Sequence, residues 1–204
     1  MRVLVGCESS GVVRDAMLAL GHEALSADLK PTERPGPHYQ GDVLDVIDYP
    51  WDLAIFHWPC TDGSTSGARW FKEKKMDGRF YRGASMWMNG WRRAAHIPHV
   101  CFEHPASVMS TLFRKRDQEV QPWQFWNGEG EEPGKGEVKT TWLWFRGLRP
   151  LVPTTPDEPG RLQSCWLMGP SDTRAEDRAR SYTGLWKAAA EQFTAQILEQ
   201  RRAA

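Results

Sequence analysis

The chain enters its first predicted strand with Val3-Leu4-Val5 and leaves it through Gly6-Cys7-Glu8-Ser9-Ser10-Gly11, a turn of small and polar residues. Apolar residues then recur at helical spacing from Val12 to Leu20, and Gly21 is placed to cap this helix. A second apolar run, Ala24 to Ala27, ends at Asp28. Strand, helix and strand at this spacing predict a right-handed parallel β-α-β unit.

The rest of the chain continues this pattern. The further predicted strands are Asp52–Phe56, Val100–Phe102 and Thr140–Phe145, the further helices are Gly83–Ala95 and Thr173–Arg202 with a break at Ser181–Gly184, and the predicted loops are Lys30–Pro37, Asn127–Glu137 and Pro150–Arg161. We therefore expect an α/β fold with a mostly parallel sheet flanked by helices. We expect one domain over residues 1–204, elaborated by a basic and aromatic segment at 69–93 and a loop-rich segment at 126–138.

Composition limits the class of protein. The 204 residues carry 26 Lys and Arg against 26 Asp and Glu, and 40% are hydrophobic, which excludes a disordered chain. No apolar run approaches the roughly 20 residues that span a bilayer, so we expect a soluble, intracellular protein with no membrane partner. The four cysteines lie far apart without a C-x-x-C pair, which argues against a zinc site or a disulfide framework.

Polar residues stand where the predicted parallel strands end, and ligands of such sheets bind beyond those ends. These positions are the Gly6–Gly11 turn, Asp28, Cys60 and Glu103. A turn of small residues admits a ligand to the backbone, and the acidic residue can bind ribose hydroxyls. The turn lacks the full G-x-G-x-x-G pattern, so a surface turn with a solvated aspartate is an equal alternative.

Cys60 follows Pro59 at a strand end, where a thiol of lowered pKa could act as a nucleophile. The alternative is a small, buried and inert cysteine, which is our interpretation of Cys7, Cys101 and Cys165. Glu103 ends an apolar strand, where a carboxylate is costly unless it is hydrogen-bonded, ion-paired or functional.

Taken in order, these segments resemble a known family. The matching stretches are Val3–Ala16, Gly41-Asp42-Val43-Leu44, Trp51-Asp52-Leu53, Pro59-Cys60, Glu103-His104-Pro105, Gln121-Pro122-Trp123-Gln124-Phe125, Lys139-Thr140-Thr141-Trp142-Leu143-Trp144, Arg180–Gly184 and Ala188–Gln192. The chain is similar to the cytosine-C5 DNA methyltransferases, and most to their short phage and prophage members. The resemblance covers nearly the whole chain and is most specific in the first sixty residues.

The resemblance implies a Rossmann-like class I methyltransferase fold and a reaction. Cys60, preceded by Pro59, would add to C6 of a pyrimidine, and Glu103, followed by His104, would hold N3 and the exocyclic amine. S-adenosylmethionine would lie over Gly6, Cys7, Glu8, Ser9, Ser10 and Gly11, with Asp28 on the ribose, Asp42 and Val43 near the adenine, and Gly184 in a segment returning to the cofactor. The substrate would be cytosine in single- or double-stranded DNA, in the cytoplasm of a bacterial or phage-infected cell. A duplex base would have to be flipped out.

Three features depart from the family pattern. Trp58 replaces a proline of the usual Pro-Pro-Cys, preceded by His57, and His104 replaces the asparagine of Glu-Asn-Pro. Trp58 could stack on a substrate base or narrow the pocket, and His104 could be an acid, a base or a replacement hydrogen-bonding group. The large target-recognition domain is missing. These departures leave open a free pyrimidine nucleotide or RNA base, a group other than methyl, or a catalytically silent binding module.

The segment from Arg69 to Arg93 is rich in both cations and aromatic rings, a combination that suits phosphate contact and base stacking. We take Arg69 and Trp70, together with His57 and Trp58, as candidate substrate-binding residues. Trp87 and Trp91 stand at helical i, i+4 spacing and are predicted to pack in the core. His96 and His99, close in sequence to the strand that carries Glu103, have no carboxylate or cysteine at ligand spacing, so no metal site is expected there.

Overall fold

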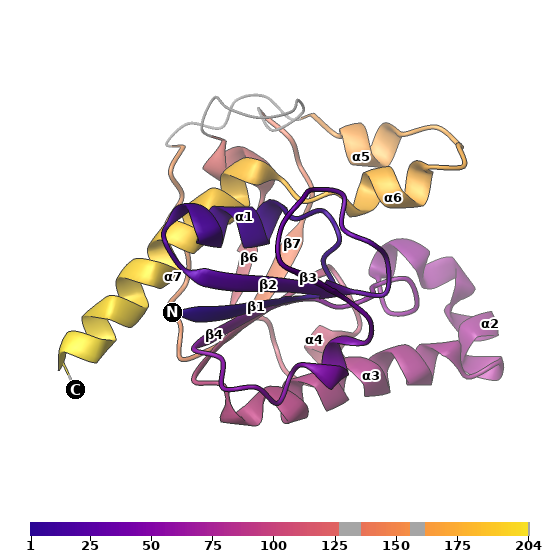
Figure 1. The fold of residues 1–204 in the computed structure, drawn as a ribbon. Coiled ribbons are helices and arrows are strands. Elements are labelled where there is room, and N and C mark those ends of the chain that lie inside the picture. The colour runs from indigo at the N-terminus through magenta and orange to yellow at the C-terminus, as the bar shows by residue number, and fades with distance from the viewer. Residues whose placement is uncertain (127–135, 156–161, 204) are drawn as a thin grey trace.

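A computed structural model describes residues 1–126, 136–155 and 162–203. One seven-stranded sheet runs through the molecule in the order β3-β2-β1-β4-β5-β7-β6 (Figure 1). The strands are β1 (Arg2–Gly6), β2 (Glu23–Asp28), β3 (His38–Gln40), β4 (Leu53–His57), β5 (His99–Pro105), β6 (Gln118–Val120) and β7 (Thr141–Arg146). The first five strands are parallel, whereas β7 pairs antiparallel with both β5 and β6. The fold is therefore a mostly parallel α/β sheet, as the sequence predicts.

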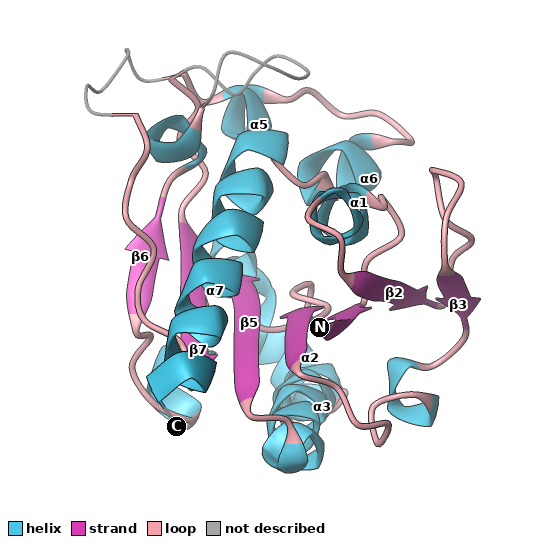
Figure 2. Cartoon of the chain, turned by 60° about the vertical axis from the view of Figure 1, so that its left-hand side comes forward, coloured by secondary structure: helices cyan, strands magenta, loops and turns pink. Residues whose placement is uncertain are grey.

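Helices cover both faces of this sheet. They are α1 (Val12–Ala19), α2 (Phe71–Met76), α3 (Arg79–Arg93), α4 (Met109–Leu112), α5 (Ser164–Leu167), α6 (Arg174–Ala179) and α7 (Thr183–Ala203), with 3-10 turns η1 (Val43–Asp45), η2 (Thr65–Trp70), η3 (Ala94–His96) and η4 (Pro122–Phe125). Figures 1 and 2 show α1 and α7 on one face of the sheet, and Figure 1 shows α3 and α4 on the other. The molecule thus has three layers.

Alternation along β4 explains how the two faces are filled. Leu53 and Ile55 belong to the apolar cluster under α1 and α7, whereas Ala54 and Phe56 belong to the cluster that includes Trp87 of α3. Successive side chains of a strand point to opposite faces, and a strand buried on both faces is apolar throughout. The prediction that Trp87 is a core residue is confirmed, since it is 1% exposed. Trp91 is partly buried and stacks on it with ring centroids 5.9 Å apart.

The predicted β-α-β unit and C-terminal helices are confirmed, including the break between α6 and α7. Gly21 follows α1 with φ of 78°. Strand β5 runs two residues beyond Glu103, because β7 pairs with Glu103, His104 and Pro105. Strands β3 and β6, of three residues each, and helix α2, of six residues, are too short for their element type to leave a periodic signal.

Parts of two predicted loops, residues 127–135 and 156–161, lie outside the described residues. Among the helices that are described, none is both long and apolar enough to span a membrane. Residues 1–126, 136–155 and 162–203 contain no group of three or more His, Cys, Asp or Glu side chains arranged to hold a metal ion.

Candidate active site

The candidate residues gather along the edge of the sheet where the parallel strands end. Gly6 ends β1, Asp28 ends β2, His57 ends β4, and Glu103 lies opposite His57 in β5. The chain order of the strands reverses between β1 and β4, which are neighbours in the sheet. In open α/β sheets, ligands bind in the crevice at such a reversal. The topology therefore brings the candidates from four strands to one edge.

The turn after β1 is strained and partly unsatisfied. Cys7 has φ of 57° and is the only non-glycine with a positive φ among the described residues. The side chain of Glu8 is buried, and its Oε1 accepts a hydrogen bond from the Ser10 hydroxyl. Its Oε2 has no partner in the described chain. Backbone strain clusters at active sites and ligand clamps, and a buried carboxylate oxygen without a partner is costly, so both features are compatible with a ligand at this turn.

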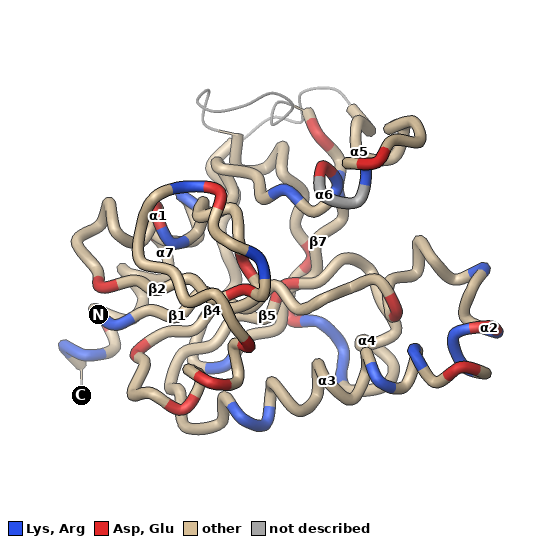
Figure 3. The backbone as a smooth tube through the Cα atoms, turned by 45° about the vertical axis from the view of Figure 1, so that its right-hand side comes forward, with Lys and Arg blue, Asp and Glu red and all other residues tan. Residues whose placement is uncertain are grey.

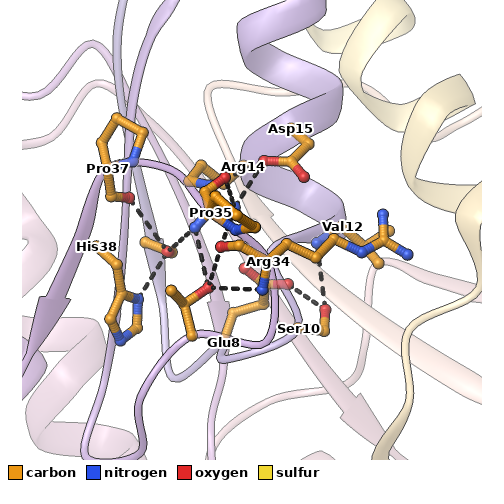
Figure 4. Close-up of polar contacts among 11 residues, drawn as sticks. Glu8, Ser10, Val12, Arg14, Asp15, Arg34, Pro35, Pro37 and His38 are labelled. Atoms are coloured by element: carbon orange, nitrogen blue, oxygen red, sulfur yellow. Dashed lines mark hydrogen bonds and ion pairs between the residues drawn. The ribbon is translucent and has the colours of Figure 1, made fainter.

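Arg14 fixes the surroundings of this turn (Figure 4). Its guanidinium is fully buried on α1 and forms an ion pair with the neighbouring Asp15 at 2.8 Å. It donates hydrogen bonds to Ser26 Oγ (3.2 Å), Thr32 Oγ1 (3.1 Å), Arg34 O (3.1 Å) and Pro35 O (3.3 Å). A Cβ on Gly11 would lie 2.5 Å from this guanidinium. One side chain therefore ties α1, β2 and the loop between β2 and β3 into one unit beside the turn.

Two carboxylates lie near Cys7. Burial raises the pKa of the Cys7 thiol to about 12, and the charges of Asp28 and Asp42 add to this rise. Asp28 Oδ1 accepts the Lys30 amide and Asp42 Oδ1 accepts the Leu44 amide, each at 2.9 Å. Both carboxylates therefore lie close enough to the Gly6–Gly11 turn to act on the Cys7 thiol, and their contacts with a cofactor stay a prediction.

Gly6 and Val43 pack against each other. A Cβ on Gly6 would lie 2.8 Å from Val43 Cγ2 and 2.4 Å from Phe56 Cδ1. Val43 is buried in the cluster under α3, so its side chain supports the turn from below.

His57 and Glu103 form a pair because β4 and β5 place them opposite each other in parallel register. Their side chains point to the same face, and His57 Nδ1 lies 3.2 Å from Glu103 Oε2. The His57 ring also contacts Trp186 of α7 edge-on, with centroids 4.7 Å apart, and its Nε2 is buried without a partner in the described chain. Burial raises the pKa of Glu103, but the hydrogen bond from His57 and nearby positive charges outweigh it, so the pKa lies below its ordinary value.

Cys60 lies three residues beyond β4 in a tight turn. Its carbonyl accepts hydrogen bonds from the amides of Gly63 (3.1 Å) and Ser64 (2.9 Å), and its side chain is half-buried. Burial and the Glu103 charge raise the pKa of its thiol, whereas the cations of Lys139 and Arg178 act in the opposite direction. The Glu103 charge therefore acts on the Cys60 thiol. Because the pKa of this thiol is raised, the thiol is protonated at neutral pH.

His104 points to the opposite face of the sheet from Glu103. It is 2% exposed, and its Nδ1 lies 3.1 Å from the Pro105 carbonyl oxygen. Burial lowers its pKa, while hydrogen bonding to the Pro105 and Pro59 carbonyls acts the other way. Of the roles considered for His104, the hydrogen-bonding one fits this placement, because the ring supports the backbone at exposed Pro59.

The expectation that Trp58 contacts a substrate is wrong for this structure. Trp58 is 4% exposed, and its ring stacks on Phe56 with centroids 5.5 Å apart. A Cβ on Gly90 of α3 would lie 2.0 Å from Trp58 Cζ2, so the indole fills the space that this glycine leaves. The alternation of β4 simply continues beyond His57, which sends Trp58 into the core under α3.

The remaining candidates form no hydrogen bond, ion pair or ring contact with Cys60 or Glu103 among the described residues. Gly184 is the second residue of α7 and packs on η4, where a Cβ would lie 2.2 Å from the Phe125 carbonyl oxygen. Its small size thus serves helix packing. Arg69 and Trp70 are exposed on η2, with Arg69 Cζ 5.1 Å from the Trp70 ring centroid. Ser9 contributes its carbonyl to the Glu33 amide at 2.8 Å.

Sequence reasoning missed three residues that shape the site. Lys139 donates to the Arg180 carbonyl at 3.2 Å, lies over the Tyr182 ring and acts on both Cys60 and Glu103. Lys74 of α2 donates to the Thr61 carbonyl and lies 3.3 Å from Asp62 Oδ1, beside Cys60. Arg14 could have been noticed as a charge within the apolar periodicity of α1.

Comparison with protein-family models and with curated protein sequences finds no match.

Proposed function

We propose that this protein uses S-adenosylmethionine to methylate C5 of a pyrimidine base, cytosine in DNA, through a covalent bond between Cys60 and C6. The observation that carries the proposal is that Cys60 follows β4 and Glu103 lies in the neighbouring strand β5, at the same carboxyl edge of the sheet, where the Glu103 charge acts on the thiol. A thiol and a carboxylate on the same edge as a strained, ligand-ready turn are the parts that this chemistry requires.

The sheet supports the finer fold assignment. Strands β3-β2-β1-β4-β5 follow the order of the dinucleotide-binding folds. Strand β7, which lies between β5 and β6 and is antiparallel to both, distinguishes this sheet from those all-parallel sheets. The proposed site therefore lies where such a fold would bind its cofactor.

The residues around the Gly6–Gly11 turn fit the proposed cofactor. S-adenosylmethionine carries an ammonium, a sulfonium and a ribose diol, and when bound it supplies the electrophilic methyl group. The unpaired Oε2 of buried Glu8 suits a cationic group. Asp28 keeps acceptor capacity beyond its bond to the Lys30 amide, which suits the diol. Asp42 and Val43 would border the adenine.

The residues of the chain have separate roles in the proposed reaction. The Cys60 thiol gives its proton to the Glu103 carboxylate, and as Sγ bonds to C6 the protonated carboxyl passes that proton to N3, so that the displaced electron pair of the ring makes C5 nucleophilic. Glu103 holds N3 and the exocyclic amine, with His57 fixing the orientation of its carboxylate. After C5 is substituted, water acting as a general base removes the C5 proton, the electron pair of that C–H bond forms the C5–C6 double bond as Sγ leaves as a thiolate, and N3 returns its proton to Glu103.

Substrate binding would itself favour the thiolate. In the free chain the Glu103 charge raises the pKa of Cys60. When Glu103 binds a nucleobase, part of the negative charge of Glu103 is offset. The Lys139 ammonium continues to lower the pKa of Cys60. The nucleophile would therefore be activated only when a base occupies the site.

The proposal is tested with DNA containing 5-fluorocytosine and labelled S-adenosylmethionine, since fluorine at C5 blocks the final elimination. We expect a covalent protein–DNA adduct that persists in denaturant and is lost in Cys60→Ser. Cys165→Ser, which changes another half-buried cysteine, should retain the adduct. Glu103→Gln should fold and lose most turnover on ordinary cytosine, by about 100-fold or more.

Intact cofactor binding without adduct or methylated product would contradict the proposal and favour a silent binding module. Mass spectrometry of the nucleosides after reaction identifies the base and the added group. Product on a free deoxynucleotide, with none on oligomers, would contradict the DNA assignment alone.

A further inference from the structure

The 3-10 turn η2 and helix α2 carry an exposed surface that the proposed chemistry does not use. We call it the η2–α2 surface and define it by Arg69, Trp70, Lys72 and Met76. Trp70 is 49% and Met76 81% exposed. These side chains line an open hollow of about 520 Å³ together with Glu73 and Asp77. Figure 3 shows basic and acidic stretches side by side on α2.

The acidic members of the hollow are already neutralised, and two of the cations are not. Arg79 of α3 pairs with Glu73 and with Asp77, each at 2.6 Å. In the described part of the chain, neither Arg69 nor Lys72 forms an ion pair with a carboxylate. The surface thus offers two cations and an indole ring to solvent, which is the combination that binds phosphates and stacks on bases.

The same helix is tied to the loop that carries Cys60. Lys74 lies on the other side of α2 and is 6% exposed. Its ammonium donates to the Thr61 carbonyl and lies 3.3 Å from Asp62 Oδ1. The loop is held on its far side as well, because the Thr65 amide donates to the Ala106 carbonyl at 2.8 Å. The η2–α2 surface is therefore linked to Thr61, the residue after Cys60, through the buried side chain of Lys74.

We propose that the η2–α2 surface binds single-stranded polynucleotide, with a base stacked on Trp70 and phosphates at Arg69 and Lys72. A single strand fits better than a duplex because only unpaired bases expose a face for Trp70. The proposal rests on the proposed function in one respect only, namely that a base of the bound strand reaches Cys60. It makes the substrate a polymer rather than a free nucleotide, and it places the strand beside the nucleophile loop.

The test is fluorescence anisotropy with a labelled 20-nucleotide single strand, the matching duplex and a deoxynucleotide, over a range of salt. We expect the single strand to bind most tightly and the deoxynucleotide least. Trp70→Ala should weaken single-strand binding by about tenfold, the value of one stacked base. Arg69→Ala with Lys72→Ala should reduce the slope of log affinity against log salt by about 1.4, since each phosphate contact contributes about 0.7.

Matched controls change an exposed aromatic and an exposed cation elsewhere. Tyr49→Ala alters a 61% exposed ring that precedes β4, and Arg202→Ala alters an exposed cation at the end of α7. Both should bind the single strand like the unchanged protein. Equal binding by Trp70→Ala and Tyr49→Ala, tighter binding of the duplex, or equal competition by polyglutamate would each overturn the proposal. Because no turnover is measured, an inactive protein would still give a clear result, and failure of binding would leave the 5-fluorocytosine experiment to judge the chemistry.

Discussion

The ionisation of Cys60 depends first on burial and then on two neighbours of opposite charge. Burial raises the pKa of the thiol, Glu103 raises it further and Lys139 lowers it. The reactive form of a cysteine is the thiolate, and a shift of one pKa unit changes its fraction about tenfold below the pKa. A change in either charge should therefore change how reactive Cys60 is before any substrate arrives.

We predict that Glu103→Gln speeds the alkylation of Cys60 by iodoacetamide at pH 8 about threefold or more, and that Lys139→Met slows it. Site-resolved mass spectrometry gives the rate for each cysteine. Cys101 provides an internal control, because it is fully buried and burial, more than the charges of Glu103 and Asp117, raises its pKa well above the ordinary value. An unchanged rate at Cys60 in both variants would show that neither charge acts on the thiol.

The packing of α3 against the end of β4 depends on the fit of the Trp58 indole, just after the strand, into the space left by Gly90 of the helix. Trp58 occupies the space over Gly90, and a Cβ there would lie 2.0 Å from its ring. We predict that Gly90→Ala destabilises the fold by about 1–3 kcal/mol through overpacking. Trp58→Phe alone should also destabilise it. The double variant should be more stable than the sum of the two predicts, by about 1–2 kcal/mol.

Urea unfolding of the four proteins measures this coupling. Gly169→Ala is the control, because a Cβ there meets nothing within 4 Å. Additive effects of Trp58→Phe and Gly90→Ala would contradict a direct contact between the ring and α3.

How far the sequence predicts each element depends on the range of the interactions that form it. The β-α-β unit, α1 and α7 follow from local periodicity, and the polar strand ends follow from the topology that this periodicity implies. The direction of Trp58 does not follow from the sequence, because the predicted strand ends at Phe56 and the alternation of side chains applies only within a strand. Lys139 and Lys74 could not be predicted, since their positions depend on the pairing of β5 with β7 and on a helix of six residues.

Across the whole molecule, acid should weaken the fold through a buried histidine. Burial lowers the pKa of His104 from its ordinary 6.5, so the unfolded chain takes up a proton at a higher pH than the folded chain. The contribution is fully present above pH 6.5 and is lost as the pH falls from there toward the folded pKa. One proton gives a slope of at most about 1.4 kcal/mol per pH unit.

We predict that His104→Asn flattens the dependence of the unfolding free energy on pH between 7 and 5, relative to the unchanged protein. Asparagine keeps a donor for the Pro105 carbonyl but does not titrate in this range. Replacement of exposed His96 by asparagine should leave the slope as it is. A slope in His104→Asn equal to that of the unchanged protein would exclude His104 as the titrating group.

The two outermost strands, β3 and β6, have three residues each. An edge strand presents unpaired amides and carbonyls that can recruit a strand from another chain, and the number of such groups grows with its length. The five longer strands lie between them and are paired on both sides. Because its edge strands are short, this sheet offers few unpaired backbone groups for β-pairing with another chain. Its stability against aggregation should therefore depend on keeping β3 and β6 docked rather than on charge, which sums to zero over the chain.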